Sequence, residues 1–248
     1  MPVYGGGKAK LGKEIFEIIK LVEKEFNWDS KLHSYFEPFC GLLGVQIHFA
    51  KEKRHCMACD ANKDIILLFK ALKKNWIPPE KCDEKQFDML KASKEHSALR
   101  GFIGVACSYS GIFFSGYRTH AGKRNYMTNS KNGFLKMVPS LKYINFLSAR
   151  DYREFDPEGL TIYCDPPYKG NGFHSEHFSS FDSESFWETM RLWSKNNLVI
   201  ISEYNAPKDF ICIWKKQIKS NYNVSVIHRT EKLFIYSRVL EQNYRLHS

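Results

Sequence analysis

The residues best suited to chemistry stand together in the tetrad Asp165-Pro166-Pro167-Tyr168, directly after the apolar run Ile162-Tyr163-Cys164. Asp165 offers a carboxylate, and Pro166 offers a backbone carbonyl whose direction the neighbouring proline rings restrict. Two such acceptors can take the two N–H groups of an amine on a planar ring, such as adenine, and stabilise the positive charge that develops when its nitrogen is alkylated. Tyr168 supplies an aromatic face on which a base taken out of a helix can stack. The pattern indicates chemistry on an exocyclic amine; a plain turn after a strand is the alternative, because Asp and Pro also favour turns.

Two earlier segments have the residue types that approach a ligand. Phe36-Glu37-Pro38-Phe39-Cys40-Gly41 leads a strand candidate into a glycine-containing turn, which lets the backbone come close to a bound molecule. It has no full GxGxxG pattern, so a dinucleotide-binding fold is not indicated. Cys59-Asp60-Ala61-Asn62 places a carboxylate at the end of the next strand candidate, where it could accept both ribose hydroxyls of a nucleoside. A helix N-cap is the alternative role of Asp60.

The elements that must position these residues alternate along the chain. Apolar spacing predicts helices over 11–26, 45–50 and 65–76, and strands over 33–37 and 55–60. After residue 135 the alternation returns, with predicted strands over 143–147, 160–164 and 198–202, a helix over 184–195, and an antiparallel hairpin formed by 224–227 and 233–236. Such alternation predicts βαβ units and a largely parallel sheet, whose ligand crevice lies beyond the carboxyl ends of the strands.

Residues 80–135 differ in character and are interpreted as an insert. A polar helical stretch over 84–99 leads into a segment rich in glycine, aromatic and basic residues. There Phe113, Phe114, Tyr117 and Tyr126 interleave with Arg118, Lys123 and Arg124. Basic groups for phosphates or base edges, with aromatic groups beside them, favour a loop that reads DNA. The alternative is a solvated loop whose aromatic side chains are buried in the core.

A second loop, residues 169–181, follows the tetrad and contains His174 and His177. A loop that closes over a flipped base is one interpretation, and a polar surface role for both histidines is the other.

The composition limits the class of protein. Lys and Arg outnumber Asp and Glu by 37 to 27, which gives a net charge of +10 and favours a polyanionic partner; a basic but otherwise ordinary soluble protein is the alternative. Seven cysteines, several in apolar runs, indicate reduced thiols rather than a disulfide framework. Cys56 and Cys59 form a lone CxxC without a second pair, so no metal site is expected. With no secretory leader and no apolar run of membrane length, we expect a cytoplasmic protein.

Taken in order, these motifs resemble the Dam-type (alpha group) N6-adenine DNA methyltransferases, in particular the forms common in phages. The resemblance covers nearly the whole chain. It rests on Tyr4-Gly5-Gly6-Gly7-Lys8, Phe36 to Gly41, Cys59 to Asn62, Asp151-Tyr152 and Asp165 to Tyr168, with Glu231-Lys232-Leu233-Phe234 similar to the closing hairpin of the family.

The resemblance assigns roles to individual positions. It implies that Tyr4, Lys8, Glu37, Phe39 and Gly41 contact S-adenosylmethionine, and that Asp60 binds its ribose. Asp151 and Tyr152 match the pair beside the adenine of the cofactor. Asp165, Pro166, Pro167 and Tyr168 match the catalytic tetrad, whose Asp165 also borders the cofactor, and Arg118, Lys123 and Arg124 fall in the target-recognition region.

The expected fold is therefore the Rossmann-like α/β fold of S-adenosylmethionine-dependent methyltransferases. It would have a mostly parallel seven-stranded sheet, a C-terminal antiparallel hairpin and an inserted target-recognition region. We expect a cofactor-binding part over residues 1–79, the insert over 80–135 and a catalytic part over 136–248.

The expected function is methyl transfer from S-adenosylmethionine to N6 of a flipped adenine in double-stranded DNA, without a metal. An RNA or cytosine-N4 methyltransferase with a related tetrad, and a catalytically silent DNA-binding protein on the same scaffold, are the alternatives. We expect a monomer or weak dimer in a bacterial or phage-infected cell. The recognition sequence and the existence of a cognate restriction endonuclease are left open.

Overall fold

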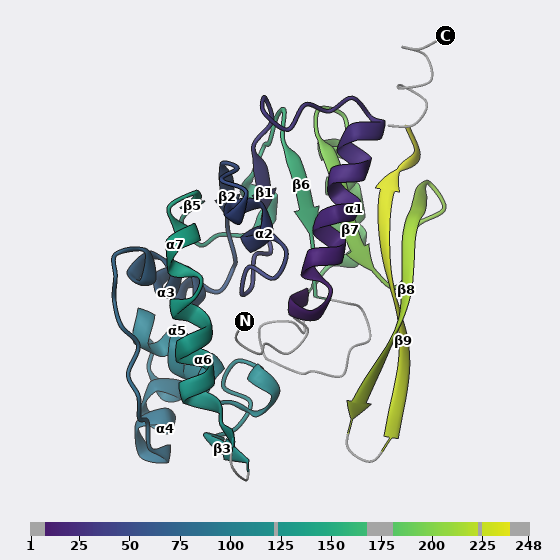
Figure 1. Cartoon of the computed structure of the whole chain (residues 1–248). Coiled ribbons are helices and arrows are strands. Elements are labelled where there is room, and N and C mark those ends of the chain that lie inside the picture. Colours follow the sequence, from purple (N-terminus) through teal and green to yellow (C-terminus); the bar gives the residue numbers. More distant parts are fainter. Residues whose placement is uncertain (1–7, 122–123, 168–180, 223–224, 239–248) are drawn as a thin grey trace. The chain divides into compact units, whose positions relative to one another are not determined.

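The computed structural model describes residues 8–121, 124–167, 181–222 and 225–238 (Figure 1). The chain divides into two compact units. The first comprises Met1–Glu17 and Glu37–Glu154, and the second comprises Ile18–Phe36 and Phe155–Ser248. Among the helices in the described ranges, none is both long enough and apolar enough to cross a membrane.

Seven strands form one sheet in the order β5-β2-β1-β6-β7-β9-β8. They are β1 (Tyr35–Glu37), β2 (Cys56–Ala58), β5 (Ile144–Phe146), β6 (Thr161–Cys164), β7 (Leu198–Glu203), β8 (Phe210–Tyr222) and β9 (Ser225–Tyr236). β2 is parallel to β5, and β6 is parallel to both β1 and β7. β9 is antiparallel to β7 and to β8. This confirms the predicted α/β fold, with a mostly parallel seven-stranded sheet and an antiparallel hairpin at its C-terminal end.

The core of the first unit forms where helix α3 (Lys63–Lys73) packs on β5. The ring of Phe69 stacks on Phe146 with 5.4 Å between centroids, and Ile65, Leu68 and Leu72 are fully buried. The short helices α2 (Gln46–Lys51) and α7 (Val138–Leu141) contact each other beside it. The predicted strand-helix alternation over the first eighty residues is therefore confirmed.

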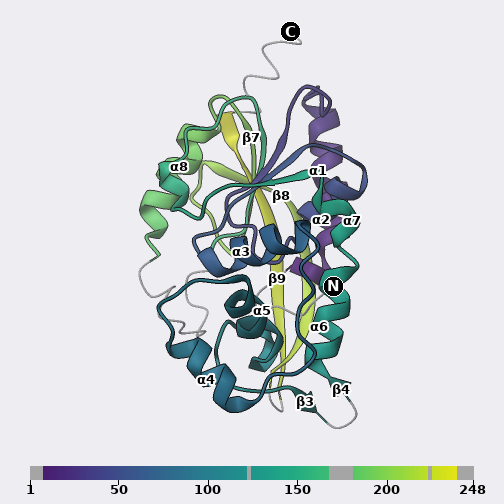
Figure 2. The same cartoon turned by 90° about the vertical axis from the view of Figure 1, so that its left-hand side faces the viewer.

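Residues 80–135 form a mostly helical part of the first unit (Figure 2). It consists of α4 (Glu84–Ala92), α5 (Ala98–Ala106), the 3-10 turn η2 (Tyr109–Gly111), the two-residue strands β3 (His120–Ala121) and β4 (Arg124–Asn125), and α6 (Tyr126–Leu135). α5 lies close against α3, because a Cβ built on Gly101 would stand 2.3 Å from the carbonyl oxygen of Asp64. Only a glycine permits this approach without a backbone shift.

A buried ion pair joins the same two helices. The Asp64 carboxylate, 1% exposed, accepts hydrogen bonds from the Arg100 guanidinium and from the backbone N–H of Ser97 at 2.8 Å, and His96 Nδ1 lies 3.1 Å from it. Because a buried carboxylate is costly unless it is paired, this network fixes the entry into α5.

One predicted helix is in fact two. The stretch 84–99 was predicted to be continuous, but α4 ends at Ala92 and α5 begins at Ala98. Ser97 starts the second helix by accepting the N–H of Arg100 on its hydroxyl at 3.1 Å, while Ser93 and Glu95 form a turn before it. Serine competes with the backbone for hydrogen bonds and so favours helix starts and turns over helix interiors.

The second unit contains the long strands β8 and β9 and the buried strands β6 and β7. All four residues of β6 and all six of β7 are buried, and helix α8 (Ser183–Trp193) begins at Asp182, whose carboxylate accepts the N–H groups of Glu184 and Ser185. At the start of β6 the Thr161 hydroxyl donates to Glu23 Oε1 at 2.5 Å. Glu23 belongs to α1 (Gly12–Glu25), so this bond attaches the end of that helix to β6.

The predicted position of the C-terminal hairpin is wrong. Residues 224–227 and 233–236 were predicted to be its two strands, but residues 225–227 and 233–236 lie in the single strand β9, whose partner is β8, and residue 224 lies outside the described residues. The predicted turn was the polar run between them, residues 228–232. β9 pairs with β7 only through Lys232, Leu233 and Phe234, so the ribbon runs on past β7 (Figure 1), where polar residues are compatible with a strand.

Candidate active site

The loop after β1 is held in place by the residues that follow β2. Backbone N–H groups of Cys59 and Cys40 donate to the carbonyls of Glu37 and Cys59 at 2.9 and 2.8 Å. The N–H of Gly41 donates to Asp60 Oδ2 at 2.9 Å, and Gly41 adopts a φ of 43°, a left-handed conformation that favours glycine. The predicted pair of Gly41 and Asp60 is thus brought into direct contact.

Asp60 is not a helix N-cap. The cap of α3 is Asn62, whose side chain accepts the N–H of Asp64 at 3.0 Å. Asp60 Oδ1 instead accepts the N–H of Asn62 at 2.8 Å. Each oxygen of a carboxylate has two lone-pair sites, so both oxygens of Asp60 keep acceptor capacity for a ligand.

The protonation of Asp60 is shifted by its surroundings. Burial raises the pKa of its carboxyl above the ordinary 3.8, and the hydrogen bonds from Asn62 and Gly41 lower it by less. The side chain remains partly exposed, so a ligand can reach it. Two aimed acceptor oxygens at a strand end have the chemistry required to bind a diol.

Glu37 ends β1 with a buried carboxylate, 3% exposed. Thiols surround it. Burial first, and the nearby Glu37 charge second, raise the pKa of Cys56 to about 12, and burial raises the pKa of Cys40 well above its usual value. These thiols therefore stay protonated at neutral pH, so they are weak nucleophiles.

The seven cysteines are free thiols, and most of them are buried. Six of the seven thiols are buried, Cys212 is exposed, and none is in a disulfide. Cys59 Sγ donates to the carbonyl of Ser148 at 3.3 Å, and within the described ranges no group of three metal-ligating side chains gathers. Cys56 and Cys59 are thus thiols of a strand and its exit.

An aromatic contact joins the loop after β1 to the segment after β5. Tyr152, 6% exposed, lies in the 3-10 turn η3 (Tyr152–Glu154), and its ring centroid is 5.1 Å from that of Phe39. β2 and β5 are parallel, so the segments after them leave the sheet at the same edge. The structure therefore brings Phe39, Asp60 and Tyr152 of the predicted cofactor set to one edge of the first unit.

Asp151 forms an ion pair with Arg153, a residue that the sequence analysis did not identify. Its two carboxylate oxygens accept Arg153 Nε and one terminal nitrogen at 2.8 and 3.0 Å, and Oδ1 also accepts the Arg153 N–H at 2.9 Å. These hydrogen bonds hold the pKa of Asp151 below its usual value. The Arg153 guanidinium lies 5.8 Å from the Tyr152 ring centroid. Any ligand that uses the Asp151 carboxylate must share it with Arg153.

The N-terminal part of the predicted cofactor set is only partly described. Lys8 begins the 3-10 turn η1 (Lys8–Lys10), is 7% exposed, and accepts the N–H of Leu11 on its carbonyl at 2.9 Å. Tyr4 lies outside the described residues. A buried lysine at the start of α1 is unusual enough to suggest a function.

The tetrad follows β6 as predicted. Asp165 and Pro167 are partly exposed and Pro166 is buried, directly beyond the buried strand Thr161–Cys164. β6 is parallel to β7, with Cys164 opposite Ile201, so Asp165 stands at the carboxyl edge of this pair. Tyr168, His174 and His177 lie outside the described residues.

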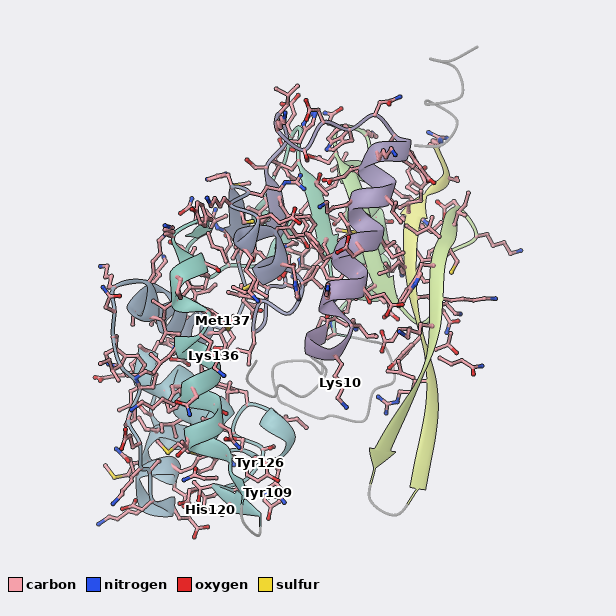
Figure 3. The ribbon with its side chains drawn as sticks, in the orientation of Figure 1. Lys10, Tyr109, His120, Tyr126, Lys136 and Met137 are labelled. Carbon is pink, nitrogen blue, oxygen red and sulfur yellow. The ribbon has the colours of Figure 1, made fainter. Side chains whose placement is uncertain are left out.

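In the insert, Arg118 is held between two aromatic rings. Its guanidinium carbon lies 4.9 Å from the Tyr109 centroid and 5.1 Å from the Tyr126 centroid, a cation–π arrangement on both faces. Figure 3 shows both tyrosines at the end of α6 where that helix begins. Among the described residues, no carboxylate pairs with Arg118.

Two aromatic residues of the insert have a packing role. Phe114 is 6% exposed and its ring lies 5.1 Å from that of Phe87. The Tyr117 hydroxyl donates to the carbonyl of Cys82 at 2.8 Å, and its ring lies 5.5 Å from that of Phe87. These side chains pack within residues 80–135, as expected from the alternative interpretation, in which the aromatic side chains of this segment are buried. Lys123 lies outside the described residues, as does the side chain of Arg124.

Comparison with known proteins gives a family for this arrangement. Residues 4–105 match the model of the D12 class N6 adenine-specific DNA methyltransferases. That span holds the loop after β1, Asp60 and the start of the insert, and it ends before the tetrad. A search of curated proteins found no match. The N-terminal part of the chain is therefore similar to the D12 class of N6 adenine-specific DNA methyltransferases.

Proposed function

We propose that the chain transfers a methyl group from S-adenosylmethionine to N6 of an adenine that is flipped out of a specific site in duplex DNA. The similarity of residues 4–105 to the D12 class supports adenine methylation of DNA. The observation that carries the finer proposal is Asp165, which leaves the buried strand β6 partly exposed at the carboxyl edge of parallel strands. Ligands of open α/β sheets bind at this edge.

In this proposal Asp165 and Pro166 act on the amine. The lone pair of an adenine amine is delocalised into the ring, so the nitrogen is a weak nucleophile. A carboxylate that accepts one N–H and the Pro166 carbonyl that accepts the other favour a pyramidal nitrogen and stabilise its growing positive charge. Pro166 and Pro167 restrict the backbone, which aims these acceptors before the base arrives. Tyr168 is proposed as the face on which the flipped base stacks.

The residues of the first unit are proposed to hold the cofactor. When bound, S-adenosylmethionine supplies an electrophilic methyl group on its sulfonium. The donor and acceptor types present fit it: aimed carboxylate oxygens of Asp60 suit the ribose diol, and the paired rings of Phe39 and Tyr152 offer an apolar border for the adenine. Tyr4, Lys8, Glu37 and Gly41 are proposed for the methionine part, and Asp151 for the adenine edge. No metal is required, because the sulfonium would leave as a neutral thioether when its bond to the methyl group breaks.

The insert 80–135 is proposed to read DNA through Arg118, Lys123 and Arg124. What supports this for Arg118 is its two-ring support together with the lack of a carboxylate partner among the described residues. An arginine held in this way keeps its planar donor fork ready for a guanine edge or a phosphate.

The test is methyl transfer to duplex DNA in vitro, with the modified nucleoside identified by mass spectrometry. The wild-type protein is expected to produce N6-methyladenine. Asp165→Ala is expected to lower kcat by about 10²- to 10³-fold or more, since it removes a major stabiliser of the developing charge. Asp182→Ala, which removes the N-cap carboxylate of α8, serves as the matched control and is expected to retain activity.

Other products would replace the proposal. N4-methylcytosine, or methylation of RNA in preference to DNA, would show a different substrate. DNA binding without transfer, with no binding of S-adenosylmethionine in calorimetry, would show a catalytically silent relative.

A further inference from the structure

The second unit carries a basic hollow beside the carboxyl end of β7 that no role above uses. It has a volume of about 310 Å³ and is lined by Tyr204, Asn205, Arg229, Thr230 and Lys232. Tyr204 and Asn205 directly follow β7, while the other three belong to β9. Two cations, two hydroxyls and one amide line it, and these are the side-chain types that contact DNA phosphates.

The two cations of this hollow have no carboxylate partner among the described residues. Neither Arg229 nor Lys232 forms an ion pair there. In the sheet register Glu203 of β7 stands opposite Lys232, but its Oε2 accepts the N–H of Tyr204 at 2.5 Å. Among the described residues, neither cation of the hollow is therefore held in an ion pair.

The β8–β9 ribbon places a further lysine beside one of these cations. Directly paired residues of neighbouring antiparallel strands point to the same side of the sheet, so Lys215 of β8 and Glu203 of β7 both stand beside Lys232. Arg229 lies three residues from Lys232 and therefore on the opposite face of β9. Like charges directly opposite destabilise a ribbon, so an anion bound between Lys215 and Lys232 would stabilise this pair.

The place of the hollow relates it to the tetrad. β6, β7 and β9 are consecutive neighbours in the sheet, and both Asp165 and Tyr204 lie beyond carboxyl ends of the parallel pair β6 and β7. Neighbouring strands lie about 4.8 Å apart, so β9 is about 10 Å from β6. Successive phosphates of one DNA strand are spaced on a similar scale, so a duplex whose base reaches Asp165 would bring its backbone past this edge.

We propose that Arg229 and Lys232, with Lys215 beside Lys232, bind backbone phosphates of the DNA substrate, in addition to the contacts of the insert. This rests on the proposed function, because DNA is its partner. The segment 210–236 holds five Lys or Arg residues and one acidic residue, so it is basic as a whole. The contacts carry no sequence information; they fix the position of the duplex.

The experiment compares two double variants with wild type by fluorescence anisotropy on a duplex at several salt concentrations. A plot of log affinity against log salt concentration has a negative slope. Arg229→Gln/Lys232→Gln is expected to make this slope less steep by about 1.8, because two phosphate contacts are lost. The ratio of the wild-type affinity for DNA to that of this variant should therefore fall about tenfold between about 50 and 200 mM salt. Methylation kcat at saturating DNA is expected to stay unchanged.

The control variant, Lys24→Gln/Lys195→Gln, removes two exposed lysines of the same unit, one in the last turn of α1 and one before β7. It is expected to retain the wild-type slope. Equal slopes for wild type and Arg229→Gln/Lys232→Gln, with methylation intact, would overturn this inference alone. The inference would also be overturned if Arg229→Gln/Lys232→Gln bound inorganic phosphate more weakly than wild type but bound DNA with unchanged affinity. If wild type neither bound nor methylated DNA, the proposed function would fail with it. Unaltered circular dichroism and S-adenosylmethionine affinity check that both variants fold.

Discussion

Asp60 accepts two backbone hydrogen bonds and still presents acceptor oxygens at a strand end. Sequence reasoning could place a carboxylate there, because an acidic residue after a predicted strand is a visible pattern. It could not tell a ribose acid from a helix cap, since both need Asp or Asn at that point. The choice depends on Asn62, two residues further on, which is itself the N-cap of α3.

The raised pKa of Asp60 predicts a pH dependence of cofactor binding. Burial lifts the pKa above 3.8, and protonation removes an acceptor for the ribose hydroxyls. Affinity for S-adenosylmethionine is therefore full above this raised pKa, and it falls as the pH drops through it, by about tenfold per pH unit below it. Isothermal titration calorimetry from neutral to acidic pH measures the effect.

The variants for this measurement differ in one position each. Asp60→Asn is expected to bind the cofactor more weakly at neutral pH and to lose the pH dependence. Asp88→Asn, which alters an exposed carboxylate of α4, should keep the wild-type profile. If Asp60→Asn titrated like wild type, Asp60 would not be the ribose acid.

Arg118 gives a second prediction at the scale of one side chain. Arg118→Lys keeps the charge but loses the planar group that lies between Tyr109 and Tyr126. It is expected to weaken binding to the target duplex more than to nonspecific DNA. Arg118→Ala is expected to lower the salt slope by about one as well. Electrophoretic mobility shifts with both duplexes measure this.

Lys136→Ala is the matched control for Arg118, because it removes one exposed charge at the other end of α6 (Figure 3). Equal loss in Lys136→Ala and Arg118→Ala would mean that only net charge matters, and the proposed role of Arg118 would be wrong.

Among the elements, α3 and α5 depend on one glycine. A Cβ on Gly101 would lie 2.3 Å from the backbone oxygen of Asp64, which cannot move aside as a side chain can. Gly101→Ala is therefore expected to destabilise the fold by about 1–3 kcal/mol, although alanine is the better helix former. Urea unfolding followed by circular dichroism measures the change.

Gly116→Ala provides the comparison at element scale, since its Cβ would first meet the side chain of Tyr109, at 3.2 Å. That ring is half exposed and can shift. A Gly101→Ala protein as stable as wild type would show that α3 and α5 do not pack as closely as described.

The elements also show where prediction from sequence stops. Strands β1, β2, β5, β6 and β7 were predicted because they are short apolar runs between turn residues. The break between α4 and α5 was missed, because it depends on how the Ser97 hydroxyl bonds locally. The β8–β9 register was missed for another reason: Ser225 to Tyr236 holds two apolar runs with polar residues between them, and pairing along their whole length with the preceding strand β8 joins them into one strand.

At the scale of the whole molecule, the identification rests on two kinds of observation. The family match covers residues 4–105, and the tetrad lies beyond it in the second unit. The net charge of +10 is consistent with a DNA substrate, and part of it lies in the ribbon 210–236.

The central claim, adenine methylation through Asp165, is tested most directly in a host that lacks DNA methylation. Single-molecule sequencing of genomic DNA after expression of the chain is expected to show N6-methyladenine within a short consensus, and the consensus would supply the recognition sequence. Expression of Asp165→Ala at the same level is expected to leave the genome unmodified. Unmodified DNA with the wild-type chain, or equal modification with Asp165→Ala, would contradict the account.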